Sequence, residues 1–168
     1  MSDAAADLLR FIDRSPTPYH AVAEVARRLA AAGFQPLAES EPWQLASGAA
    51  RYVVRGGSLL AFVAGGRQPA EAGFHWIGAH TDSPNLRVKP VPDLAREGYQ
   101  QLALEPYGGV LLHTWLDRDL SLAGRVSVAT PGGIATRLVD FRRPLLRVPN
   151  LAIHLQREIV SEGLKLNA

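Results

Sequence analysis

The sequence predicts an α/β protein in which a helix-flanked mixed sheet is followed by a smaller β-rich module. Three observations support this prediction. Residues 1–33 carry apolar side chains at helical spacing, and residues 34–90 carry them at strand spacing. From about residue 91, short strand-like runs alternate with turn signals. We expect the domain boundary between residues 92 and 93, which gives domains of 1–92 and 93–168.

Two helices are predicted at the start of the chain. The apolar run at residues 8–12 belongs to the first helix, which stops at Ser15–Pro18 because a residue before proline avoids the helical conformation. Thr17 is suited to cap a second helix that has Pro18 at its first position. Gly33 is suited to end it. The core-facing positions of this second helix follow the i, i+3, i+4, i+7 pattern and are Val22, Val25, Ala26 and Leu29.

Strands are predicted after Gly33. Residues 51–64 form a hairpin around the Gly56–Gly57 turn. Residues 73–79 are largely apolar and predict a strand that is buried on both faces. The β-rich module is closed by one helix over residues 150–162. Its predicted strands cover residues 100–104, 109–116, 124–129 and 134–139.

Composition excludes several classes of protein. Of the 168 residues 47% are hydrophobic, which is enough for a packed core and excludes global disorder. The net charge of +2, without a basic run, argues against nucleic-acid binding. The absence of cysteine excludes disulfides and thiolate metal ligands. The N-terminus lacks signal-peptide features and no apolar run could span a bilayer, so we expect a cytoplasmic protein that does not bind membranes.

A polar cluster at residues 78–84 follows the predicted buried strand, where ligands of α/β sheets collect. His80 and Asp82 are two positions apart and share one face of an extended segment. Asp82 could therefore accept the ring N–H of His80, an arrangement that orients a metal-bound imidazole. The same two residues could instead make ordinary turn hydrogen bonds, because H-x-D alone is a weak pattern.

Other histidines and acids are weaker candidates. The cluster at residues 113–119 could hold a metal, but Arg118 stands between its two aspartates, so we favour a structural ion-pair network. The spacing of His154 places it at the edge of the apolar face of a helix, which favours a structural histidine over a metal ligand. The same interpretation applies to His20. His75 is expected to be buried in the predicted strand.

The number of ligands limits the chemistry of these residues. A catalytic zinc takes three protein ligands and a water, and a two-metal site needs more. His80 is the one convincing ligand, and there is no H-E-x-x-H, G-x-S-x-G, P-loop or G-x-G-x-x-G motif. In a metalloenzyme, most of the site would lie outside this sequence.

The chain resembles the M18 family of metallo-aminopeptidases, the aspartyl aminopeptidase family. The similar segments occur in family order and include the motifs S-P-T-P-Y-H-A, G-A-H-T-D-S-P-N and T-W-L-D-R-D-L-S. They lie at residues 15–21, 78–90, 107–109, 114–126 and 144–157. The resemblance implies the N-terminal part of such an enzyme: an incomplete zinc-aminopeptidase catalytic domain followed by a β-rich inserted dimerisation domain, truncated at its C-terminal end.

The resemblance also implies roles for three residues. His80 matches a zinc ligand, and Asp82 matches the acid that orients it. His154 matches a family histidine near the active site, supplied across the dimer interface. We expect Asp82 and His154 to serve catalysis, and we prefer His154 as a donor to substrate over His154 as a metal ligand.

The function expected from the resemblance is release of N-terminal Asp or Glu residues from peptides by a metal-activated water, with two zinc ions per complete subunit. Dimers would build a dodecamer. Arg87 and Lys89 are candidates for the basic pocket that an acidic substrate needs. The alternative is a catalytically incomplete fragment that acts only as a self-associating structural module. In either case we expect the isolated 168-residue chain to be inactive.

Overall fold

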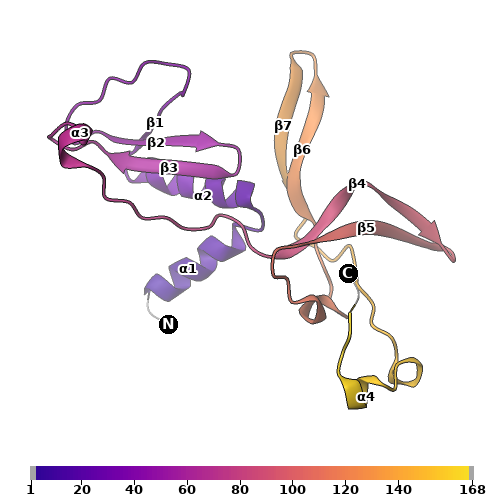
Figure 1. The fold of residues 1–168 in the computed structure, drawn as a ribbon. Helices are drawn as coiled ribbons and strands as arrows, with labels where there is room; N and C mark the ends of the chain where they lie inside the picture. Colours follow the sequence, from indigo (N-terminus) through magenta and orange to yellow (C-terminus); the bar gives the residue numbers. More distant parts are fainter. Residues whose placement is uncertain (1–2, 167–168) are drawn as a thin grey trace. The chain divides into compact units, whose positions relative to one another are not determined.

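The computed structural model describes residues 3–166, which form two compact units (Figure 1). The first unit contains the chain up to Asp82 together with Ala123–Asp140. The second contains Ser83–Leu122 together with the chain from Phe141 onward. The predicted boundary at residues 92 and 93 lies within one strand of the second unit. Compact units and evolutionary domains are different divisions of a chain, so that boundary stays a prediction.

Both predicted N-terminal helices are present. Helix α1 spans Asp3–Asp13 and helix α2 spans Pro18–Ala31. Thr17 caps α2 as expected, because its hydroxyl accepts a hydrogen bond from the His20 amide at 3.4 Å. Gly33 follows the end of α2 with a φ of 89°, a conformation that glycine adopts without steric cost.

A buried carboxylate joins the charged side chains of these helices. Glu24 is 6% exposed and accepts hydrogen bonds from Arg27 at 2.7 and 2.8 Å and from Arg28 at 2.8 Å. Arg28 also contacts Asp7 of α1 at 2.6 Å. The hydrogen bonds from Arg27 and Arg28 lower the pKa of Glu24 to about 2. The carboxylate therefore stays ionised at neutral pH.

The first unit contains a three-stranded mixed sheet. Strand β1, Gln35–Pro36, pairs in parallel with β2, Ala50–Arg55, and β2 pairs antiparallel with β3, Ser58–Val63. The β2–β3 hairpin turns at Gly56–Gly57, as predicted. Helix α2 covers one face of this sheet, as Figure 1 shows. The buried apolar side chains come from α2 and β2 and are Ala21, Val22 and Val53.

The predicted buried strand at residues 73–79 is wrong. After the short helix α3, Pro69–Ala72, this segment has no regular structure, and Ile77 is 100% exposed. His75 is exposed as well, contrary to expectation. A strand forms only when a neighbour accepts and donates its ladder hydrogen bonds. No strand in residues 3–166 pairs with this segment.

Two hairpins contain the four remaining strands of the described residues. In the second unit, β4, Asn85–Arg96, pairs antiparallel with β5, Tyr99–Tyr107, and a bulge interrupts the pairing between Val88 and Asp93. In the first unit, β6, Ala123–Thr130, pairs antiparallel with β7, Gly133–Asp140. The strands predicted over residues 100–104, 124–129 and 134–139 are therefore confirmed. Neither compact unit corresponds to the inserted dimerisation domain that the family resemblance predicts over residues 93–168.

The other two predictions for the β-rich module fail. Residues 109–116 contain the 3₁₀ helix η1, Leu112–Trp115, because the amide and hydroxyl of Thr114 both donate to the Leu111 carbonyl and close a tight turn. The helix predicted over residues 150–162 is reduced to η2, Ile153–Leu155, and α4, Ile159–Glu162. Gln156 has a φ of −147°, which breaks the helix between them. No helix of the described residues is long and apolar enough to cross a membrane.

Candidate active site

His80 and Asp82 form the side-chain contact that the sequence predicts. The Nδ1 atom of His80 lies 3.0 Å from Oδ1 of Asp82. Because an ionised carboxylate only accepts hydrogen bonds, the hydrogen belongs on Nδ1, and the lone pair of Nε2 is left for another partner. The His80 side chain is 91% exposed, so that nitrogen can be reached from solvent. The pair thus has the form of one metal-ligand arm with its carboxylate behind it.

The backbone between His80 and Asp82 is anchored to the N-terminal sheet. The Thr81 hydroxyl donates to the carbonyl of Gly57, in the β2–β3 turn, at 2.7 Å. A Cβ atom at Gly57 would lie 3.4 Å from Pro18 at the start of α2, which is a van der Waals contact. The turn is therefore packed on the beginning of the helix and carries the segment that bears His80. In the sequence, the paired glycines indicate a turn but not this anchoring contact.

The described residues do not complete a zinc site. In residues 3–166, no three histidine, aspartate or glutamate side chains lie close enough to hold one ion. The chemistry of the pair fits zinc, since a neutral imidazole backed by a carboxylate is a common zinc ligand. One ligand does not hold a catalytic metal. The structure brings His80 and Asp82 together in the first unit, and it places His154, an exposed residue of η2, in the second.

The aspartates of the T-W-L-D-R-D segment make structural contacts with residues 147–150 of the same unit. Oδ1 of Asp117 accepts a hydrogen bond from the Asn150 amide at 3.1 Å. Asp119 lies 3.5 Å from the guanidinium of Arg147. The contacts are structural, but they differ from the expected network around Arg118, since the aspartates contact residues 147–150 and Arg118 donates to the Thr114 carbonyl.

The two basic candidates for an acidic-substrate pocket each have a partner on β5. The guanidinium of Arg87 lies 3.3 Å from the centroid of the Tyr107 ring, a cation–π contact. The ammonium of Lys89 lies 3.2 Å from a carboxylate oxygen of Glu105. Lys89 in particular is neutralised by this ion pair, so Arg87 is the stronger of the two candidates.

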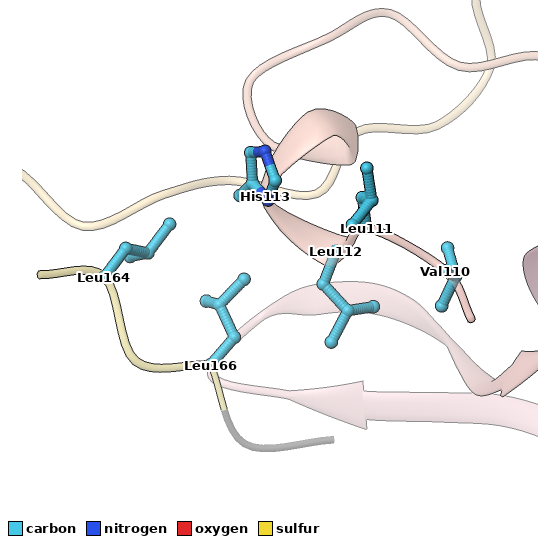
Figure 2. A pocket seen from close by; sticks show the side chains of 6 residues that line it. All are labelled: Val110, Leu111, Leu112, His113, Leu164 and Leu166. Carbon is cyan, nitrogen blue, oxygen red and sulfur yellow. The ribbon is translucent and has the colours of Figure 1, made fainter.

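An apolar groove of about 390 Å³ lies in the second unit (Figure 2). Its only titratable lining residue is His113. None of His80, Asp82 and His154 lines the groove. Most of the lining residues are leucines, which cannot act as catalytic groups. The lining residues are Val110, Leu111, Leu112, His113, Leu164 and Leu166.

Comparison with known proteins identifies the family. Residues 11–168 match the family model described as aminopeptidase I zinc metalloprotease (M18). The chain is 54% identical over 161 residues to a probable M18 family aminopeptidase 2 of Streptomyces coelicolor, covering 96% of this chain and 36% of that relative. It is 52% identical over 162 residues to the corresponding protein of Azotobacter vinelandii, with 96% and 38% covered. The chain thus spans somewhat more than a third of the length of these relatives.

Solved structures agree with this assignment. A chain of the cryo-EM structure of the Ape4 and Nbr1 complex superposes with a TM-score of 0.86 at 42% identity, covering 96% of this chain and 32% of that one. A chain of the S. cerevisiae mApe1 dodecamer superposes with a TM-score of 0.81 at 38% identity, covering 90% and 36%. The chain belongs to the M18 family of zinc metallo-aminopeptidases.

Proposed function

We propose that this chain contributes to a zinc-dependent aminopeptidase that releases N-terminal residues, acidic ones by preference, from peptides in the cytoplasm. Membership of the M18 family supports the reaction class. The observation that carries the proposal is the 3.0 Å contact between His80 Nδ1 and Asp82 Oδ1, within a segment that matches the family. The acidic preference has the weaker support of Arg87 on β4.

Each residue has a distinct task in this proposal. His80 offers the Nε2 lone pair as a zinc ligand, and Asp82 fixes its tautomer and ring orientation through Nδ1. When bound, zinc polarises the scissile carbonyl and lowers the pKa of a water molecule. His154 donates a hydrogen bond to the substrate from a neighbouring copy of the chain, and its service as a metal ligand is the alternative. The remaining ligands and the general base come from outside the described residues.

Self-association is the second proposed property. The neighbour from S. cerevisiae is a dodecamer, and we propose that this chain likewise assembles with copies of itself. Strands β4 and β5 form a two-stranded sheet, as do β6 and β7, and such sheets are marginally stable alone. The competing function, a non-catalytic assembly module, is favoured by the incomplete ligand set of residues 3–166.

A chimera tests the catalytic proposal. The 161 aligned residues of the Streptomyces coelicolor relative are replaced by those of this chain, and hydrolysis of Asp-, Glu- and Leu-naphthylamide is measured with zinc. We expect turnover of the acidic substrates, and a loss of roughly 100-fold or more with His80→Ala, because the metal template is damaged. A folded but inactive chimera beside an active parent would favour the assembly module. Faster turnover of the Leu substrate would refute the acidic preference.

A further inference from the structure

Asp117 has an unusual backbone conformation for a residue with a side chain. Its φ is 53°, in the left-handed region, which few residues with a side chain enter, asparagine and aspartate more readily than the others. It directly precedes Arg118 between η1 and β6. A residue held in this region indicates that the surrounding contacts determine its conformation.

Three hydrogen bonds join Asp117 to one other segment of the second unit, residues 147–150. The Asp117 amide donates to the Val148 carbonyl at 2.9 Å. Its Oδ1 accepts from the Asn150 amide at 3.1 Å. Its own carbonyl accepts from the Arg147 guanidinium at 3.0 Å. An adjacent parallel bridge between Leu116 and Val148 continues the same attachment.

This attachment is the last one before His154. Among the hydrogen bonds of the described residues, that of the Asn150 amide is the final non-local one preceding His154, and those that follow are local to η2 and α4. The predicted helix over 150–162 does not form, so the histidine lies in a single short turn, the 3₁₀ helix η2. Four residues of chain therefore separate the hydrogen bond of Asn150 from His154.

We propose that Asp117 is a positioning residue that places the segment bearing His154. The left-handed turn directs the amide and the carboxylate of Asp117 to the same strand-like segment, and so fixes where the chain leaves for η2. The functional part of this proposal rests on the proposed role of His154, whereas the structural part stands on the contacts of Asp117 alone.

Four substitutions separate the contribution of the Asp117 carboxylate from that of its left-handed backbone conformation. Asp117→Ala removes the acceptor and disfavours the left-handed conformation. Asp117→Gly removes the acceptor but accommodates that conformation, so it is the variant that folds without strain. Asp117→Asn keeps an acceptor oxygen and tolerates a positive φ, and it should rescue. Asp119→Ala is the matched control, because Asp119 loses its charge near the same Arg147 without carrying the hydrogen bond to Asn150.

The first measurement is NMR of the whole 168-residue chain. In Asp117→Ala and Asp117→Gly, we expect the Asn150 amide to exchange roughly 10–100-fold faster, because a hydrogen bond to a charged acceptor is lost. The ring and amide signals of His154 should shift and narrow. Asp117→Asn and Asp119→Ala should resemble the parent, and His20 in α2 should report an intact first unit. Unchanged Asn150 exchange in Asp117→Gly, or an equal effect of Asp119→Ala, would overturn the proposal.

The second measurement uses the active chimera. We expect Asp117→Gly to lower kcat/KM at unchanged zinc content, with recovery in Asp117→Asn. If His154→Ala impairs catalysis while Asp117→Gly does not, positioning by Asp117 is refuted and the proposed function stands. If His154→Ala is without effect although Asp117→Gly mobilises residues 150–155, the role of His154 is refuted and the structural part of the proposal stands.

Discussion

Asp82 contacts His80 through one carboxylate oxygen, and that contact can be weakened without removing an atom from the site. In the active chimera, Asp82→Asn keeps an oxygen that can accept from Nδ1 but loses the negative charge that raises the basicity of the imidazole. We expect zinc affinity to fall roughly 10–100-fold with the fold unchanged. Competition with a chromogenic chelator measures this, with His80→Ala as the reference for a lost ligand. Equal affinities of the parent and the Asn variant would make Asp82 only a turn residue.

Thr81 offers a test of the anchor beneath the same pair. Thr81→Val keeps the shape of the side chain and removes the hydroxyl that donates to Gly57 at 2.7 Å. We expect roughly a 10-fold loss of zinc affinity in the chimera, since a ligand whose backbone is less well fixed pays more entropy on binding. Thr81→Ser retains the donor and should bind zinc like the parent. Indistinguishable affinities of the Val and Ser variants would contradict an anchoring role.

Helix α2 illustrates what a single element contributes to stability. The ordinary pKa of a glutamate is about 4.5, and that of Glu24 is lowered to about 2 by hydrogen bonds from Arg27 and Arg28. The ionised form is therefore favoured in the folded state, and this contribution is present above pH 4.5 and is lost as the pH falls toward 2. We expect Glu24→Gln to destabilise the first unit by about 1.5–3 kcal/mol at pH 7.

The pH dependence distinguishes this effect from a packing defect. Thermal unfolding of the parent and of Glu24→Gln is compared at several pH values, and the difference should shrink between pH 4.5 and 2. Asp7→Asn serves as a control, because Asp7 is half-exposed and its ion pair with Arg28 is better screened by solvent. A destabilisation that is independent of pH would exclude the ionised carboxylate as its cause.

Among the helices and strands, the sequence correctly predicted those that are determined by residues close together in the chain. The cap at Thr17 and the β2–β3 hairpin are local, and both are confirmed. Residues 73–79 needed a pairing partner, which no pattern within them specifies, and they do not form a strand. The predicted helix at 150–162 is interrupted at Gln156, whose extended φ of −147° separates η2 from α4.

The candidate site was predictable to a similar extent. The two-residue spacing of His80 and Asp82 placed them on one face of an extended segment and so allowed the contact that the structure shows, although the pattern itself is weak. Spacing alone ranked His154 as an ordinary helix-edge residue, and only the family resemblance raised it. The Thr81–Gly57 hydrogen bond spans 24 positions, so periodicity could not have revealed it.

For the molecule as a whole, the ligand set limits activity. No three potential ligands are grouped in residues 3–166, and a catalytic zinc takes at least three protein ligands. We expect no turnover of Asp- or Glu-naphthylamide by the purified chain with added zinc or manganese. The active chimera is the positive control for the assay. Turnover that survives purification and disappears with His80→Ala would show that the chain carries a complete site.

The exposed apolar surface of the whole chain leads to a prediction about assembly. Val91 on β4 is 84% exposed and Ile134 on β7 is 82% exposed, and each lies in a two-stranded sheet whose outer edges have no partner strand in the described residues. Such edges are templates for pairing with another chain. We therefore expect the chain to sediment as a dimer or larger species at micromolar concentration.

Val91→Lys and Ile134→Lys should shift it toward monomer, because a charge on an edge strand opposes pairing. Val160→Lys on α4 is the matched control, since Val160 is also 82% exposed but lies outside the hairpins. A monomeric parent would refute self-association, and an equal response to all three lysines would indicate general hydrophobic clustering in place of pairing through the hairpins.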